Sequence, residues 1–267
     1  MFYTGINTQD VAKIGLATST DLSTWERLDA PVFTCHDAPW TWCDEPGYGL
    51  DFRDPFVMPD PDVAGGWLMY YATRRDSETT LMVPGLAKSG GDLTHWEDAG
   101  PLFSLGLPSW QSRRGIFESP HLFEHDGTWY IAYTTNDGQQ LLFAEATDSP
   151  SDTSDGGWTK FDTVPNVDCF QFTNGFASEY FADTVAGGTA KEFFCNVAGG
   201  EGGRIEIRQI WWPPGRQFSF DVFRPAAVTQ LIAGMGKTSA TLTWAAPGDD
   251  SLSWVELVTI ALPIPPA

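Results

Sequence analysis

Short apolar runs separated by turn residues recur along the whole chain. Pairs such as Gly65-Gly66 and Asp126-Gly127 lie between the runs, and such pairs favour tight hairpin turns. No stretch of useful length shows the 3.6-residue period of an amphipathic helix. The pattern therefore predicts an all-β chain of short antiparallel strands.

The apolar runs also group into four similar modules. Each full module has an acid-bearing strand, an aromatic strand, a small-residue strand and an outer strand near a tryptophan. The modules cover about residues 1–31, 52–99, 117–161 and 177–222. A repeat of four strands is typical of a β-propeller blade, whereas a β-sandwich, the competing architecture, predicts no such repeat.

Three acids lie at the heads of the acid-bearing strands, namely Asp54, Glu118 and Glu179. We assign them to equivalent positions of successive modules, which a propeller brings to a common centre. Convergent carboxylates are what the cleavage of a glycosidic bond requires. The repeat therefore predicts a central carboxylate site.

Two motifs, Arg53-Asp54-Pro55 and then Glu118-Ser119-Pro120, resemble those of five-bladed propeller glycoside hydrolases. The resemblance covers roughly residues 1–222 and is strongest to the β-fructosidases of family 32, followed by the arabinan- and xylan-active family 43. It implies an oligosaccharide or polysaccharide partner with a furanose or pentose unit (fructosyl, arabinosyl or xylosyl). Asp54 would then be the transition-state stabiliser, Glu118 the general acid/base, and Arg53 a neighbour that holds the pocket.

The family's third carboxylate, in an Asn-Asp-Pro-type motif of the first blade, has no counterpart in this sequence, which by this comparison begins inside the second blade. Asp51 and Glu179 are the candidate substitutes. Strand alternation places Asp51 on the face opposite Asp54, and we expect Glu179 to order the site. Two kinds of function stay open: a retaining or inverting glycoside hydrolase, or a propeller without catalysis, which either binds saccharides or is an inactive remnant that lacks the nucleophile or base.

Other side chains have a functional and a structural interpretation. His121 could tune the acid or meet a central ion, or it could be a satisfied strand histidine. Trp40 and Trp110 lie in loops between modules, where their rings could stack on sugars or pack locally. The resemblance requires no cofactor, although these families often carry calcium in the channel. A tryptophan recurs at matching positions of the modules and is expected to be structural: Trp25, Trp96 and Trp158.

The segment after Arg224 differs from the modules. Residues 225–229 and 238–250 resemble the opening strands of a fibronectin type III domain, which needs about 90–100 residues. We therefore predict a propeller over residues 1–223 and a fibronectin-like fragment over residues 224–267. Alternatively, strands at 228–232, 239–244 and 253–261 could complete a blade and cover exposed sheet edges.

The 267 residues carry 35 Asp and Glu against 15 Lys and Arg, a formal net charge of −20. This balance argues against nucleic acid and anionic membranes as partners, and no apolar stretch approaches the roughly 18 residues of a membrane span. The composition fits a halophile-type acidic surface, and an ordinary acidic secreted protein fits equally. We expect an extracellular monomer.

Four cysteines are present, Cys35, Cys43, Cys169 and Cys195. The first two flank a Trp- and Pro-rich loop, and the other two flank the module that contains Glu179. Disulfides within these two pairs would fit an oxidising compartment, and free thiols are the alternative. Neither spacing is a zinc pattern.

Overall fold

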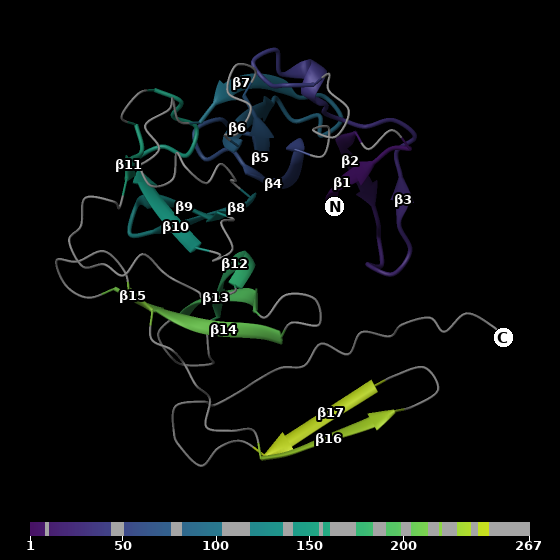
Figure 1. Ribbon diagram of the computed structural model, residues 1–267, viewed down its shortest axis with the longest axis vertical. Coiled ribbons are helices and arrows are strands. Elements are labelled where there is room, and N and C mark those ends of the chain that lie inside the picture. The colour runs from purple at the N-terminus through teal and green to yellow at the C-terminus, as the bar shows by residue number, and fades with distance from the viewer. Residues whose placement is uncertain are drawn as a thin grey trace. The chain divides into compact units, whose positions relative to one another are not determined.

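The computed structural model shows an all-β chain, and the strands of the residues that it describes form five sheets (Figure 1). The structure describes residues 1–8, 11–43, 51–75, 82–102, 118–135, 141–154, 157–160, 175–183, 191–198, 204–212, 219–220, 229–235 and 240–245. Within these ranges the one helical element is a short 3-10 helix, η1 (Cys35–Asp37). No helix of the described residues is long and apolar enough to cross a membrane.

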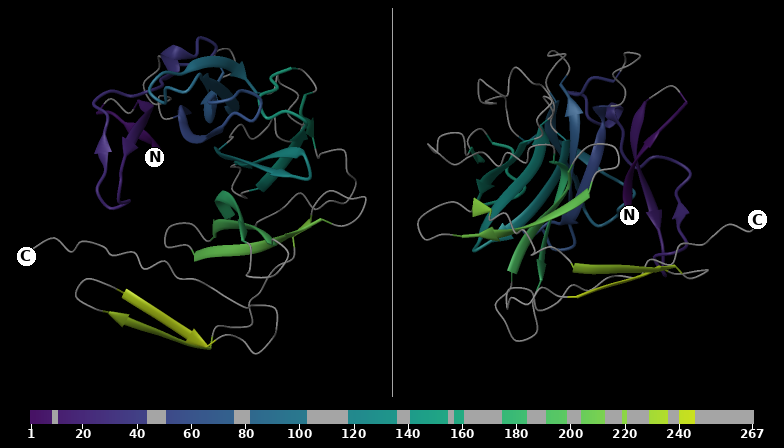
Figure 2. Two further views of the ribbon diagram at one scale, coloured as in Figure 1. Left: turned by 180° about the vertical axis from the view of Figure 1, so that it is seen from behind. Right: turned by 60° about the horizontal axis from the view of Figure 1, so that its bottom comes forward.

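Four of the sheets correspond to the four predicted modules (Figures 1 and 2). The first contains β1 (Phe2–Ile6), β2 (Ala12–Thr18) and β3 (Glu26–Arg27), and the second contains β4 (Arg53–Pro59), β5 (Trp67–Arg74), β6 (Met82–Ser89) and β7 (Glu97–Pro101). The third contains β8 (Glu118–His125), β9 (Thr128–Thr135), β10 (Leu141–Thr147) and β11 (Thr159–Lys160). The fourth contains β12 (Gly175–Asp183), β13 (Lys191–Ala198), β14 (Arg204–Trp211) and β15 (Ser219–Phe220). Within each sheet the strands follow one another in sequence order. The described elements are strands apart from η1, so the all-β prediction is confirmed.

Two tyrosine–glycine pairs show how the first two sheets correspond. Tyr3 on β1 pairs with Gly15 on β2, and Tyr71 on β5 pairs with Gly85 on β6. In both pairs the tyrosine ring lies over the glycine, where a Cβ would overlap the ring. The three strands of the first sheet are therefore the equivalents of β5, β6 and β7.

Neighbouring sheets are joined by buried apolar clusters. One cluster joins the first and second sheets and includes Ile14, Phe33, Phe52, Tyr71 and Trp96. The other joins the second and third sheets and includes Leu68, Tyr70, Leu86, Leu122, Ile131 and Tyr133. Each such side chain contributes about 1.5–3 kcal/mol by leaving water, so these two clusters hold the three sheets together.

The recurring tryptophans have the structural role that we predicted. The indole N–H groups of Trp25 and Trp96 donate to the carbonyls of Leu22 (3.3 Å) and Leu93 (2.9 Å), three residues earlier in each case. Trp158 donates in the same way to the carbonyl of Asp152 at 2.9 Å. Each ring thus closes the turn that leads to the outer strand.

The chain divides into two compact units, residues 1–180 with 194–206, and residues 181–193 with 207–267. In the second unit β16 (Thr229–Met235) and β17 (Ala240–Ala245) form a two-stranded antiparallel sheet. These strands match the predicted strands at 228–232 and 239–244, and 253–261 lies outside the described residues. The boundary at residues 223/224 and the completion of a blade by the tail stay predictions.

Candidate functional site

The heads of β4 and β8 bring three of the predicted site residues into one cluster. Arg53 lies between the two acids, with its Nη2 2.5 Å from Oε1 of Glu118 and its Nε 3.7 Å from Oδ2 of Asp54. The strands β1, β4 and β8 lie side by side within the first compact unit. The two motifs that we expected to converge therefore meet at one ion-pair cluster.

A bulge at the head of each strand sets the directions of these side chains. The register between β4 and β5 shifts between Arg53 and Phe56, and that between β8 and β9 shifts between Glu118 and His121. A bulge places one extra residue on its strand and redirects the side chains around it. Arg53, not Asp54, is therefore the structural equivalent of Glu118.

Our assignment of Asp54 and Glu118 to equivalent positions is thus wrong by one residue. Asp54 corresponds to Ser119, and both have the positive φ (57° and 50°) that is uncommon outside glycine. The actual equivalents, Arg53 and Glu118, carry opposite charges and face each other. Backbone strain of about 1–3 kcal/mol persists only where the surroundings enforce it, and such strain is most common at functional sites. The same strained conformation at the head of both strands therefore supports a functional site here.

Backbone hydrogen bonds fix the two left-handed residues. The N–H of Asp54 donates to Oγ1 of Thr4 on β1 at 3.0 Å. The N–H of Ser119 donates in the same way to Oδ2 of Asp54 at 3.0 Å. The backbone N–H of each of these two residues thus donates to a side chain of the neighbouring sheet. The Asp54 carboxylate is therefore held between β4 and β8.

Asp51 joins the same cluster, so the prediction that it lies on the opposite face is wrong. Its Oδ1 is 3.4 Å from Nη1 of Arg53, and its Oδ2 is paired with Nε of Arg74 at the end of β5. Strand alternation does not apply to Asp51, because β4 begins only at Arg53. The cluster therefore contains three carboxylates and two arginines, and no pattern in the sequence pointed to Arg74.

The surroundings of Glu118 favour its protonated form. Burial raises the pKa of this carboxyl above its usual value, Arg53 opposes that change, and the negative charges of Asp54 and Asp51 add to it. The Glu118 and Asp54 side chains keep 23% and 27% of their surface exposed, so a ligand can reach both. A carboxyl with a raised pKa, open to solvent, can serve as a general acid.

His121 contacts an aromatic ring and a backbone group rather than the charged side chains of the cluster. Its ring packs against Phe56 with the ring centroids 4.4 Å apart. Burial lowers the pKa of His121 to about 4, although a hydrogen bond with the backbone of Tyr180 partly opposes this shift. The ring is therefore neutral near pH 7, which supports the interpretation as a satisfied strand histidine.

Glu179 on β12 is exposed. Its negative charge acts on the partly buried thiol of Cys195 on β13, and it contributes to a raised pKa of that thiol after the larger effect of burial. The structure thus relates Glu179 to Cys195, while the charges that act on Glu118 come from Arg53, Asp54 and Asp51. A role of Glu179 in ordering the site stays a prediction.

Of the two candidate loop tryptophans, the structure describes only Trp40. Its indole N–H donates to Oδ1 of Asp98 at 3.1 Å, and its ring lies 6.4 Å from that of Tyr71. These contacts agree with the packing interpretation. Trp110 lies outside the described residues.

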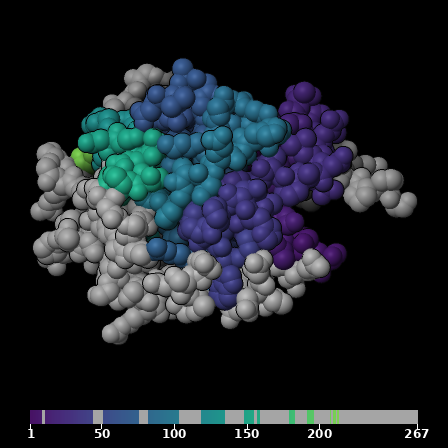
Figure 3. Space-filling view, turned by 90° about the horizontal axis from the view of Figure 1, so that it is seen from above, coloured from purple at the N-terminus to yellow at the C-terminus, as the bar shows by residue number. Residues whose placement is uncertain are grey.

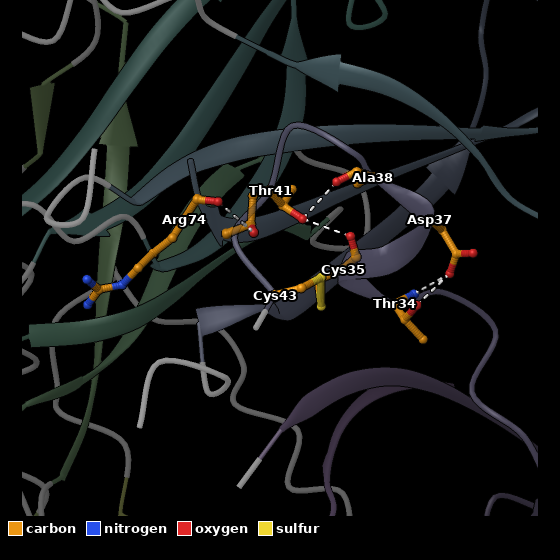
Figure 4. The surroundings of a disulfide bond; sticks show 8 residues. Thr34, Cys35, Asp37, Ala38, Thr41, Cys43 and Arg74 are labelled. Atoms are coloured by element: carbon orange, nitrogen blue, oxygen red, sulfur yellow. Dashed lines mark hydrogen bonds between the residues drawn. A yellow bond between two sulfur atoms is a disulfide. The ribbon is translucent and has the colours of Figure 1, made fainter. Parts of the chain in front are cut away.

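The first predicted disulfide is present and closes the loop after the first sheet (Figure 4). Cys35 is bonded to Cys43, and in the space-filling view the first two sheets and this loop form one continuous surface (Figure 3). Cys195 is a free thiol, so the predicted bond to Cys169 is not formed, and Cys169 lies outside the described residues. The module that contains Glu179 is therefore not cross-linked through Cys195.

The donor groups of the described residues do not fit a metal ion. His36 has its ring close to both sulfurs of the disulfide, but the disulfide removes the thiolates that a metal would need. In the ion-pair cluster, the oxygens of Asp51 and Glu118 face arginines, whose positive charge opposes a calcium ion. Calcium elsewhere in the chain stays a prediction.

Comparisons with known proteins show the fold. No protein-family model matches the sequence, and no curated protein matches it. The structure is similar to that of a thermostable family-43 glycoside hydrolase, with 18% identity and a TM-score of 0.60 over 82% of this chain and 70% of that chain.

Two sugar complexes are similar as well. One is fructan 1-exohydrolase IIa of Cichorium intybus with 1-kestose, at 16% identity and a TM-score of 0.57 over 90% of this chain and 47% of that chain. The other is a family-32 β-fructofuranosidase of Bombyx mori with sucrose, at 17% identity and a TM-score of 0.54 over 89% and 50%. This chain spans about half the length of these two proteins. The protein therefore has the all-β propeller fold of the glycoside hydrolases of families 43 and 32.

Proposed function

We propose that the protein is a glycoside hydrolase that binds a furanose or pentose unit of an oligosaccharide or polysaccharide at the cluster of Arg53, Asp54 and Glu118. The observation that carries the proposal is a partly exposed carboxyl with a raised pKa, Glu118, beside a second carboxylate held by backbone hydrogen bonds, Asp54. Proteins of the same fold bind 1-kestose and sucrose. Fructosyl, arabinosyl and xylosyl units are the candidates.

In this proposal the protonated Glu118 is the general acid. Its proton passes to the glycosidic oxygen as the bond to the anomeric carbon breaks and positive charge develops on the sugar ring; water then adds to that carbon and loses a proton to a base of the site. Asp54 stabilises that charge and accepts hydrogen bonds from sugar hydroxyls. Arg53 holds both carboxylates at fixed positions, which reduces the cost of organising the site during the reaction.

A non-catalytic saccharide-binding protein is the second candidate, and one observation favours it. Hydrolysis also needs a carboxylate that attacks the sugar or activates water. The third carboxylate of the cluster is Asp51, and both of its oxygens are paired with arginines. These ion pairs occupy both oxygens, so Asp51 is poorly placed to attack a sugar or to contact a water, and binding without cleavage is the expected behaviour if Asp51 is the group that the site relies on.

One experiment separates these two functions. Hydrolysis of fructans, arabinans, xylo-oligosaccharides and aryl glycosides is measured at low and at molar salt, together with binding of the same oligosaccharides by calorimetry. If the protein is a hydrolase, Glu118→Gln and Asp54→Asn lower the rate by about 10²–10⁴-fold, as expected for the loss of an acid or of charge stabilisation. Glu97→Gln, which changes an exposed acid on β7, should match the parent.

Each outcome has a definite meaning. Binding that is weakened by both site variants, without measurable hydrolysis of any substrate, assigns the second function. Hydrolysis that persists unchanged in both variants shows that the assignment of the site is wrong.

The proposed surroundings follow from the chemistry of the chain. The disulfide between Cys35 and Cys43 supports an extracellular location, because such bonds persist in oxidising compartments. The net charge of −20 supports a neutral saccharide partner rather than nucleic acid or an anionic membrane. A monomer without a required cofactor is part of the same proposal.

A further inference from the structure

We infer that Asp51 and Arg74 are positioning residues that hold Arg53 beside Glu118 and thereby set how tightly Glu118 holds its proton. The inference rests on the proposed role of Glu118 as the acid of the site. Its contacts and its main test, however, do not depend on hydrolysis.

Four side chains of alternating charge form a continuous row. The row runs from Glu118 through Arg53 (2.5 Å) to Asp51 (3.4 Å from Arg53) and ends at Arg74, which pairs with Asp51. The four side chains keep only 13–23% of their surface exposed. Ion pairs with this degree of burial are screened less by salt than surface pairs, so a change at one end of the row is felt at the other.

The guanidinium of Arg53 is shared between the two acids. It offers Nη1 to Asp51 and Nη2 to Glu118, and these donors belong to one rigid planar group. A movement of Nη1 toward Asp51 therefore also moves Nη2 and changes its hydrogen bond with Glu118. Asp51 is both the anchor of Arg53 and a competitor of Glu118 for it.

Arg74 is held from a different part of the chain. Its carbonyl accepts a hydrogen bond from the N–H of Trp42 at 3.0 Å, and Thr41 forms a bridge with Arg75. Thr41 Oγ1 in turn donates to the carbonyls of Cys35 (2.9 Å) and Ala38 (2.8 Å), inside the loop that the disulfide closes (Figure 4). The disulfide loop thus fixes the backbone from which Arg74 reaches Asp51.

Other titratable groups lie on β8 or on the strands near it. Within the described residues, Asp54 acts on Glu118 directly from β4, and its negative charge favours protonation. His121 on β8 itself is neutral above a pKa of about 4, and Glu179 on β12 acts on Cys195. Besides burial, which raises the pKa of Glu118 most, the attraction of Arg53 lowers this pKa and the repulsion of Asp54 and Asp51 raises it. Arg74 offsets the Asp51 charge.

This arrangement predicts shifts of opposite sign. Arg74→Gln leaves Asp51 without its second partner, so Asp51 draws Arg53 away from Glu118 and the pKa of Glu118 rises. Asp51→Asn removes a competing negative charge, so Arg53 turns fully to Glu118 and the pKa of Glu118 falls. In the double variant, Arg74→Gln adds little to Asp51→Asn, because Arg74 acts through Asp51.

The test is a pH titration of the carboxyl carbons by NMR in protein labelled at glutamate, with the Glu118 signal assigned from its loss in Glu118→Gln. Arg75→Gln is the control, since it removes the same charge one residue further along the chain. Arg74→Lys retains the charge and should return the pKa of Glu118 toward the parent value. If one variant fails to fold, the inference can still be tested, because Arg74→Lys and Asp51→Asn probe the row separately.

Three outcomes would overturn the inference: shifts of the same sign in Arg74→Gln and Asp51→Asn, a shift in Arg74→Gln no larger than in Arg75→Gln, or full additivity in the double variant. Where hydrolysis is measurable, the alkaline limb of the pH–rate profile should move with the pKa of Glu118. Opposite shifts without any hydrolysis support the inference and reject the hydrolase. Hydrolysis without opposite shifts does the reverse.

Discussion

His121 is a partly buried imidazole whose neutral state makes the stability of the protein depend on pH. Its pKa is lowered from 6.5 to about 4, chiefly by burial. The unfolded chain therefore binds a proton below pH 6.5 that the folded protein does not accept until about pH 4. The contribution of His121 is fully present above pH 6.5 and is lost as the pH falls from 6.5 to 4, by up to about 3 kcal/mol.

We expect the free energy of unfolding, measured with urea, to fall across this window in the parent protein. His121→Phe, which retains a ring against Phe56, should flatten the fall. His95→Gln should keep it, because His95 is exposed. A fall of equal steepness in His121→Phe and the parent would contradict this account of His121.

The residues of the site could be predicted from the sequence only in part. The two motifs identified Asp54 and Glu118, which do meet at one cluster. The sequence did not indicate the left-handed conformation of Asp54 and Ser119. Both residues precede a proline, and a following proline normally favours extended backbone. The bulges, and with them the matching of Arg53 to Glu118 and the inclusion of Asp51, depend on neighbouring sheets that a local pattern does not reveal.

At the scale of the strands, the pairing of Gly85 with Tyr71 gives a test of packing. The Tyr71 ring lies over Gly85, and the ring cannot move aside easily, because it is fully buried and its hydroxyl donates to Asp98 at 3.1 Å. We therefore expect Gly85→Ala to lower the free energy of unfolding by about 1–3 kcal/mol, the usual cost of overpacking. Gly15→Ala should cost less, since Tyr3 is only partly buried.

Gly90→Ala is the matched control for Gly85→Ala. It lies in the turn after the same strand, and a Cβ there would meet nothing within 4 Å. The free energy of unfolding should change by no more than about 0.5 kcal/mol. Equal losses in Gly85→Ala and Gly90→Ala would show that the close approach of Tyr71 does not explain the glycine.

The strands could be predicted better than the side-chain contacts. Apolar periodicity and turn pairs placed the head of β4 within one residue (52 against 53) and that of β8 likewise (117 against 118), because these patterns act locally. Cys35 and Cys43 are only eight positions apart in the sequence, so their disulfide could be proposed from the spacing. The free thiol of Cys195 could not, since pairing depends on where distant segments lie.

At the scale of the whole molecule, the net charge of −20 sets how the protein should respond to salt. Some exposed acids are held in the charged state by their turns. Hydrogen bonds from Thr24 and Ser23 lower the pKa of Asp21 to about 2, and those from Thr94 do the same for Asp92. Such acids repel one another at neutral pH, and self-repulsion weakens the compact state.

The Debye length falls from about 10 Å at 0.1 M salt to about 3 Å at 1 M, so molar salt should largely remove this repulsion. We therefore expect the melting temperature to rise markedly between dilute buffer and molar sodium chloride. Sorbitol at equal osmolality controls for effects that do not involve charge, and it should raise the melting temperature less. The row from Glu118 to Arg74 is largely buried and is screened less than surface charges, so its contribution should change little over the same salt range. A melting temperature that stays constant across the salt series, or that rises equally in sorbitol, would mean that the acidic composition is incidental to stability.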